Sequence, residues 1–218
     1  MSEGTTMLEQ VNDFMGRILI AGEENSWDYG FLESITKQLA SGRTLSANQE
    51  RAFQQIKGRW SDEALKARAA WAKDWDDEKE QKFCIALHYY NRTGYYGNIT
   101  GKYFRYDPEN GKSVRCGGTP TMAEYNKIVE NKYAAGVIRN LQSEPKFPVG
   151  STATIRAAVG RRLSNQPVII LKYGDASTVQ SHAKGAKPVQ VLPIGSSDPI
   201  WTEERHLKKA QKRKSDKR

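Results

Sequence analysis

The fold changes character at one stretch of the sequence, Leu141-Gln142-Ser143-Glu144-Pro145-Lys146-Phe147-Pro148. Before it, apolar residues recur at helical spacing from Tyr125 to Leu141, and Thr121-Met122-Ala123-Glu124 has the pattern of a capping box that opens the helix. Pro145 is expected to close this helix, because the residue before a proline avoids the helical region. The helical period then disappears, so a different kind of structure is predicted beyond Pro145.

Downstream of Pro145 the sequence has short apolar runs separated by Gly, Ser, Asn and Pro. The strands predicted there are Thr152–Val159, Pro167–Tyr173, Thr178–Ser181, Pro188–Leu192 and a last one at Ile200–Thr202. Regularly spaced short strands favour a small barrel or sandwich. We therefore expect an all-β module at residues 145–204.

Upstream, residues 1–144 are predicted to be a helical domain. A first helix runs from Met7 to Leu19, with its apolar residues on one face, and ends near Gly22. Ser26 is expected to cap a second helix, and Ser46-Ala47-Asn48-Gln49 has the capping-box pattern for a third. We expect the second and third helices to form a helical hairpin with a short turn.

The next helix is expected to start after Ser61 and to continue past Trp71 and Trp75 toward Tyr90. The run Asp74–Glu80 holds five acids in seven residues and is most simply a solvated surface. A β-hairpin is predicted within the helical domain, near residues 99–116. There, Ile99–Tyr106 resembles a strand, Asp107-Pro108-Glu109-Asn110-Gly111 a turn, and Lys112–Cys116 a returning strand.

Charge is distributed unevenly along the 218 residues. The net charge is +9, but residues 205–218 alone carry eight Lys/Arg and one Asp, so the preceding 204 residues carry only +2. We expect residues 205–218 to form a basic tail. No long apolar run predicts a membrane helix, and no secretory signal is expected at the N-terminus. Two cysteines are too few for a disulfide framework, so a reduced, cytoplasmic protein is expected, with Cys84 and Cys116 unpaired.

A resemblance supports the β-module prediction. The segment Phe147–Arg156 resembles the opening strand of SH3-like β-barrels, and Val189–Pro193 with Glu203–Leu207 resembles the closing strand and terminal turn of such a barrel. The whole chain also resembles small uncharacterised proteins of tailed bacteriophages. The expected fold class is therefore α+β, a helical N-terminal region with an inserted β-hairpin followed by a small SH3-like β-barrel. The resemblance implies a host-cell cytoplasmic location.

The basic tail is the clearest candidate for function. Its cations can neutralise phosphates and release counterions, which favours DNA or RNA as the partner. The candidate nucleic-acid-binding residues there are Lys208, Lys209, Lys212, Arg213, Lys214, Lys217 and Arg218, joined by Arg161 and Arg162 in the β-module. A contiguous positive face that links Arg156 to these groups would favour nucleic acid, and the alternative is a solubilising terminus without a specific partner.

Tyr103 and Arg105 in the predicted hairpin are a second candidate. In a strand they share one face, where an aromatic ring can stack on a base while a cation holds a phosphate. The alternative interpretation is that one face of the hairpin belongs to the core.

No pattern in the sequence predicts catalysis or a metal site. The chain lacks a phosphate-binding Gly-Lys-Ser/Thr loop, a dinucleotide fingerprint and a Gly-x-Ser-x-Gly elbow. Cys84 and His88 share a helical face, but no second ligand pair makes them a zinc site. We expect no enzyme activity, no metal and no cofactor. The leading hypothesis is a nucleic-acid-associated phage accessory protein. A protein-interaction adaptor that binds a host or phage machine, or a structural virion component, remains an alternative.

Overall fold

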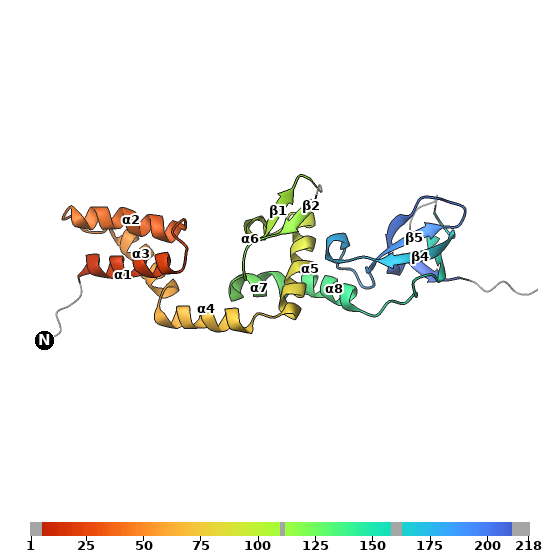
Figure 1. The fold of residues 1–218 in the computed structure, drawn as a ribbon, viewed down its shortest axis with the longest axis horizontal. Coiled ribbons are helices and arrows are strands. Elements are labelled where there is room, and N and C mark those ends of the chain that lie inside the picture. Colours follow the sequence, from red (N-terminus) through yellow and green to blue (C-terminus); the bar gives the residue numbers. More distant parts are fainter. Residues whose placement is uncertain (1–5, 110–111, 158–162, 211–218) are drawn as a thin grey trace, which may run out of the picture. The chain divides into compact units, whose positions relative to one another are not determined.

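The structure is a computed structural model that describes residues 6–109, 112–157 and 163–210. Its contacts divide the chain into two compact units, Met1–Asp74 and Trp75–Arg218. This division lies between residues 74 and 75. The expected junction between residues 144 and 145 stays a prediction. The fold is mixed α+β, with helices first and an antiparallel sheet toward the C-terminus (Figure 1).

The first unit is helical. Its elements are α1 (Met7–Ile20), α2 (Trp27–Ala40), α3 (Ala47–Arg59) and α4 (Asp62–Asp74). The predicted caps are confirmed, because the Ser26 hydroxyl accepts a hydrogen bond from the Tyr29 N–H, and Ser46 and Gln49 bond each other's backbone N–H groups. The buried core of this unit comprises Val11, Phe14, Ile18, Leu32, Ile35, Leu45, Phe53, Ile56 and Trp60.

One end of the α1–α2 pair leaves large apolar side chains in solvent. Trp27, the first residue of α2, is 65% exposed and stacks on Phe31 with 5.1 Å between ring centroids. Ile35, two turns further on, is fully buried. Because an α-helix has 3.6 residues per turn, a series of residues four apart rotates gradually around the helix axis. The apolar series that starts at Trp27 therefore does not stay on the buried face.

The second unit begins with helices and a hairpin. Its helices are α5 (Asp77–Thr93), α6 (Gly97–Tyr103), α7 (Met122–Val129) and α8 (Lys132–Gln142), and its hairpin strands are β1 (Phe104–Asp107) and β2 (Lys112–Arg115). Two helices that the sequence predicts as continuous are interrupted. The Asp76 carboxylate accepts from the Lys79 N–H at 2.7 Å and starts α5, and the Asn131 side chain accepts from the Tyr133 and Ala134 N–H groups and starts α8.

The hairpin is shorter than predicted. The strand-like stretch Ile99–Tyr106 is helical in its first part, since α6 extends to Tyr103 and β1 starts at Phe104. Ile99, Thr100 and Tyr103 are buried together, at positions that share one side of a helix. Burial of these side chains outweighs the local preference of the isoleucine and the threonine for a strand.

The sheet comprises β3 (Thr152–Ile155), β4 (Pro167–Tyr173), β5 (Pro188–Pro193), β6 (Ile200–Glu203) and β7 (Leu207–Lys209). Its order is β6-β5-β4-β3-β7, with every neighbouring pair antiparallel. The expected strands at 167–173, 188–192 and 200–202 are confirmed. The expected closed barrel is not, because β6 and β7 are opposite edges that the 3₁₀ turn η3 (Glu204–His206) connects without a ladder between them.

Two further predictions about the sheet region need correction. Thr178–Ser181 is not a strand, because the Asp175 carboxylate caps the 3₁₀ turn η2 (Ala176–Thr178) through the Ser177 N–H. The segment expected to start the tail at residue 205 belongs to the sheet as far as Lys209, because β7 pairs with β3. The buried sheet core comprises Phe147, Ala153, Ile155, Val168, Ile170, Val189, Val191 and Leu207.

Candidate functional site

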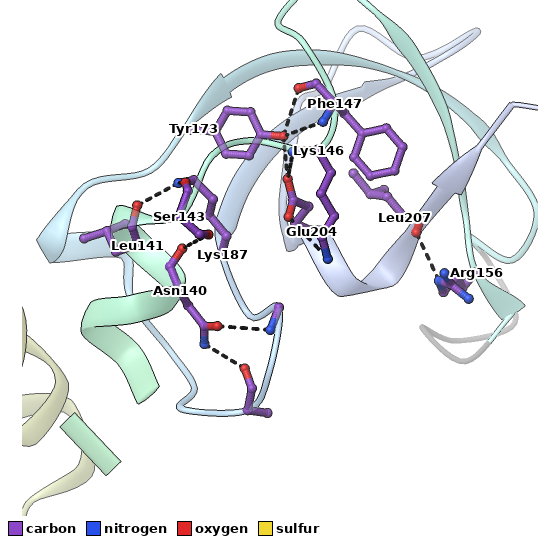
Figure 2. A network of polar contacts seen from close by, with 12 residues as sticks. Asn140, Leu141, Ser143, Lys146, Phe147, Arg156, Tyr173, Lys187, Glu204 and Leu207 are labelled. Carbon is purple, nitrogen blue, oxygen red and sulfur yellow. Dashed lines mark hydrogen bonds and ion pairs between the residues drawn. The ribbon is translucent and has the colours of Figure 1, made fainter. Parts of the chain in front are cut away.

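Cationic side chains follow the edge formed by β3 and β7. Arg156 directly follows β3, and its backbone N–H donates to the His206 carbonyl oxygen at 2.8 Å while its Nε donates to the Leu207 carbonyl oxygen at 3.0 Å. Figure 2 shows this side chain beside Leu207. Lys208 Nζ donates to Asn165 Oδ1 at 2.8 Å. We call Arg156, Lys208 and Lys209 the cationic edge.

The remaining basic candidates of this region lie outside the described residues. They are Arg161, Arg162, Lys212, Arg213, Lys214, Lys217 and Arg218. The register places Leu207 opposite Ile155 and Lys209 opposite Ala153. Lys209 therefore lies at the other end of β7, about 7 Å along the strand from Leu207 at roughly 3.3 Å per residue.

A buried carboxylate fixes the turn that leads into β7. Glu204 in η3 is 2% exposed, and its Oε1 accepts from the Lys146 backbone N–H at 2.6 Å (Figure 2). The Tyr173 hydroxyl lies 3.0 Å from the same oxygen and 2.9 Å from the Phe147 carbonyl oxygen. Burial and the neighbouring Glu204 carboxylate raise the pKa of Tyr173 above its ordinary value, so this hydroxyl stays protonated and can act as a donor.

A buried lysine joins the sheet to the end of α8. Lys187 is 5% exposed, and its ammonium donates to the carbonyl oxygens of Leu141 and Ser143 (Figure 2). Burial lowers its pKa, and Glu204 and Glu144 counteract this effect. The Asn140 side-chain amide donates to the Ala183 carbonyl oxygen at 2.7 Å, and its Oδ1 accepts from the Gly185 N–H at 3.0 Å. Two of the carbonyl groups at the end of α8, those of Leu141 and Ser143, thus find their donor in Lys187, directly before β5.

The hairpin candidates occupy different environments. Tyr103 is the last residue of α6, is 8% exposed, and donates from its hydroxyl to Glu124 Oε2 at 2.8 Å. Its ring packs edge-on against Phe83 with 5.2 Å between centroids. Arg105 lies on β1 with its side chain exposed, opposite Val114 on β2. Tyr103 and Arg105 therefore do not form one strand face, and Tyr103 has no free face for a base.

Possible metal-binding and reactive groups are scattered. Within the described parts of the chain, no three His, Cys, Asp or Glu side chains gather in a way that could hold a metal ion. Cys84 and Cys116 are free thiols. Burial raises the pKa of Cys84 and lowers that of His88, so the thiol and the neutral imidazole are favoured at pH 7.

The second unit contains an aromatic pocket that the sequence did not predict. This pocket of about 400 Å³ is lined by Tyr89, Tyr90, Tyr95, Tyr96, Tyr133 and His182. The adjacent pairs Tyr89-Tyr90 and Tyr95-Tyr96 are the local signal that could have pointed to it. Tyr133 and His182 come from distant parts of the chain, so their inclusion has no local signal.

Comparisons of the chain with protein-family models, curated proteins and solved structures find no match. Among the residues described by the structure, no helix has both the length and the apolar character that a membrane crossing requires.

Proposed function

We propose that the protein is a non-enzymatic accessory protein of a tailed bacteriophage that associates with DNA or RNA through the cationic edge and the basic tail. The observation that carries this proposal is that Lys208 and Lys209 lie on β7, which Arg156 contacts from the end of β3, and that five further basic residues follow β7 in the sequence. Residues 205–218 carry a net charge of +7, and residues 1–204 only +2. A polyanion would therefore be attracted to this end of the chain, where neutralised phosphates release counterions.

The sheet would supply a rigid base for this interaction. Arg156 is held by the Leu207 carbonyl, and η3 is held by the buried Glu204, so both sides of β7 are anchored to the sheet module. The four-stranded meander β3–β6, followed by a 3₁₀ turn and a last strand that returns to pair with β3, supports placing the module in the SH3-like class, as an open variant. Because phosphate contacts carry no base information, the proposed binding is insensitive to sequence.

The first unit favours a second candidate function, that of a protein-binding adaptor. Leu19 is 56% exposed, Ile20 is 90% exposed and Trp27 is 65% exposed, and all three lie where α1 ends and α2 begins. Clustered exposed apolar side chains are typical of protein interaction sites. Replacement of Ile20 and Trp27 by Ser would abolish capture of such a partner without changing the binding of nucleic acid.

A salt series tests the proposed function. Fluorescence anisotropy would compare the full chain, a variant that ends at Ala210, and Lys208→Gln, each with a labelled oligonucleotide. Ending at Ala210 removes Lys212, Arg213, Lys214, Lys217 and Arg218. The log–log salt slope should become shallower by about 0.7–0.9 for every phosphate that the variant no longer neutralises, and binding should weaken to a similar extent for unrelated sequences.

Lys37→Gln provides the matched control, because this lysine loses the same charge from an exposed position on α2. Its binding curve should match that of the unmodified protein. Equal salt slopes for the full chain and the Ala210 variant would contradict the role of the tail. Absence of any binding at low salt would refute the nucleic-acid function and leave the adaptor as the better explanation.

A further inference from the structure

The aromatic pocket lies where α5 ends, α6 begins and α8 begins, with one ring from the segment before β5. All six lining residues are tyrosine or histidine. Tyr133 meets His182 edge to face, with 4.9 Å between ring centroids and 79° between the ring planes, and Tyr90 meets Tyr96 at 4.9 Å and 82°. A volume of about 400 Å³ is within the range of small-molecule sites.

Hydrogen bonds hold the inner rings of the pocket in place. The Tyr90 hydroxyl donates to Asn131 Oδ1 at 2.5 Å, and the Tyr89 hydroxyl lies 3.1 Å from His182 Nδ1. His182 itself is seated against α8, since a Cβ added at Gly136 would lie 2.8 Å from the His182 carbonyl oxygen. The pocket is therefore largely formed before any ligand enters.

The rim combines exposed rings with backbone strain. Tyr95 is 67% exposed and Tyr133 is 43% exposed, so part of each ring is available to a ligand. Tyr96 adopts the left-handed conformation with φ 55° and ψ 38°, which residues other than glycine rarely adopt. Strained backbone of this kind concentrates at binding sites.

The charges beside the pocket indicate the kind of ligand. Lys127 Nζ lies 5.4 Å from the Tyr96 ring centroid, and Lys132 Nζ lies 5.0 Å from the Tyr133 ring centroid. No carboxylate is among the lining residues. The lysines beside these rings repel a cationic ligand and attract a negative charge, and the aromatic walls can stack on a flat ring. A ligand that joins a flat ring to a negative charge therefore fits both features. A nucleotide has this combination, because its base can stack on tyrosine and its phosphate can approach lysine.

We propose that this pocket binds the base of a nucleotide, either free or within a single strand, with the phosphate near Lys127 and Lys132. For a single strand the inference rests on the proposed nucleic-acid function, and it gives that function a second site with a different physical basis. A base that is paired and stacked in a duplex cannot enter, so the pocket would favour single-stranded over double-stranded nucleic acid. Every base has an aromatic face, so the preference among bases is weak.

The test uses 2-aminopurine, a fluorescent adenine analogue whose emission is quenched when it stacks on an aromatic ring. Full-length protein would be titrated with a single-stranded oligonucleotide that contains 2-aminopurine, and separately with 2-aminopurine riboside monophosphate. Anisotropy of an end label on the oligonucleotide reports total binding, and quenching reports the pocket. Both probes should be quenched by the unmodified protein.

The variants separate the loss of the aromatic face from the loss of the fold. Tyr133→Leu and Tyr95→Leu should weaken binding of the monophosphate roughly 5- to 150-fold and remove the quenching, whereas Tyr133→Phe should behave as the unmodified protein. Tyr106→Leu is the matched control, because this tyrosine is 65% exposed on β1 and does not line the pocket. Circular dichroism melts identify any variant that is unfolded.

Each outcome distinguishes the pocket from the proposed function. If the oligonucleotide binds but quenching is unchanged in both leucine variants, the pocket inference is wrong and the nucleic-acid function stands. If only the monophosphate is quenched, in a Tyr133-dependent way, and the anisotropy of the end-labelled oligonucleotide does not change, the pocket takes a free nucleotide and the nucleic-acid function fails. If neither probe is quenched, or if choline displaces the monophosphate, the pocket inference is overturned.

Discussion

Replacing Glu124 by Gln should destabilise the second unit at neutral pH and much less in acid. The Glu124 carboxylate accepts hydrogen bonds from Lys102 Nζ at 2.8 Å, the Tyr103 hydroxyl at 2.8 Å, and the N–H and hydroxyl of Thr121 at 3.1 and 2.9 Å. Burial by itself raises the pKa of this carboxyl, but the hydrogen bonds from Lys102, Tyr103 and Thr121 outweigh it and lower the pKa from 4.5 to about 2. This difference corresponds to at most about 3 kcal/mol of stability.

The lowered pKa of Glu124 determines how the stability of the protein changes with pH. A carboxyl with a lower pKa in the folded state stabilises the fold fully above its ordinary value of 4.5, and that stability is lost as the pH falls toward about 2. Glu124→Gln keeps the size of the side chain but removes the charge, so at pH 7 we expect a loss of about 2 kcal/mol. For a unit of this size the loss corresponds to roughly 4–8 °C in the melting temperature.

Urea denaturation at pH 7 and at pH 3.5 measures the effect directly. The difference between the unmodified protein and Glu124→Gln should be about 1 kcal/mol smaller at pH 3.5. Glu130→Gln is the control, because Glu130 is exposed at the other end of α7 and should change stability by less than about 0.5 kcal/mol. An equal destabilisation by Glu124→Gln at both pH values would refute the electrostatic reasoning.

Two further predictions concern the packing of α8 and can be read from shifts in urea midpoint. Gly136→Ala should destabilise the protein by about 1–3 kcal/mol, because its Cβ would lie 2.8 Å from the His182 carbonyl oxygen. The control Gly16→Ala in α1 meets nothing within 4 Å and should stabilise the protein by roughly 0.5–1 kcal/mol. A gain in stability from both changes would contradict the close contact at Gly136. Lys187→Met should lower the free energy of unfolding by about 1–3 kcal/mol, because two carbonyl groups at the end of α8 lose their donor. Lys184→Met, at an exposed position, is the control and should be nearly neutral. Similar effects of the two changes would contradict the buried role of Lys187.

Helix starts were the most predictable feature, because a cap needs only a few neighbouring residues. Ser26, Ser46 and Thr121 cap helices as their patterns indicate. Asp76 and Asn131 also cap helices, but each stands inside a longer apolar period, which hides the interruption. The acidic run at residues 74–80 contains the start of α5, where negative charge is favourable near the helix N-terminus.

The candidate sites depend on contacts that a local pattern does not contain. Leu207–Lys209 has the composition of a tail, and only its pairing with β3 makes it a strand. Tyr103 was grouped with Arg105 by proximity in sequence, although its ring belongs to the core around Phe83. The aromatic pocket brings Tyr89 to His182, which is 93 residues further along the chain. Tertiary packing decides each of these positions.

The bonds from the sheet to the end of α8 also determine how the chain can be divided for biochemical work. A fragment that starts at residue 145 would contain Lys187 but neither of its acceptors, Leu141 and Ser143, and it would lack Asn140, which holds the turn at 183–185. Such a fragment would carry an ammonium group without its two acceptors and a loose turn beside β5, so a negative binding result with it would be uninformative. A fragment that starts at Trp75 retains every one of these partners, and limited proteolysis of the whole protein should preserve that piece in preference to the shorter one.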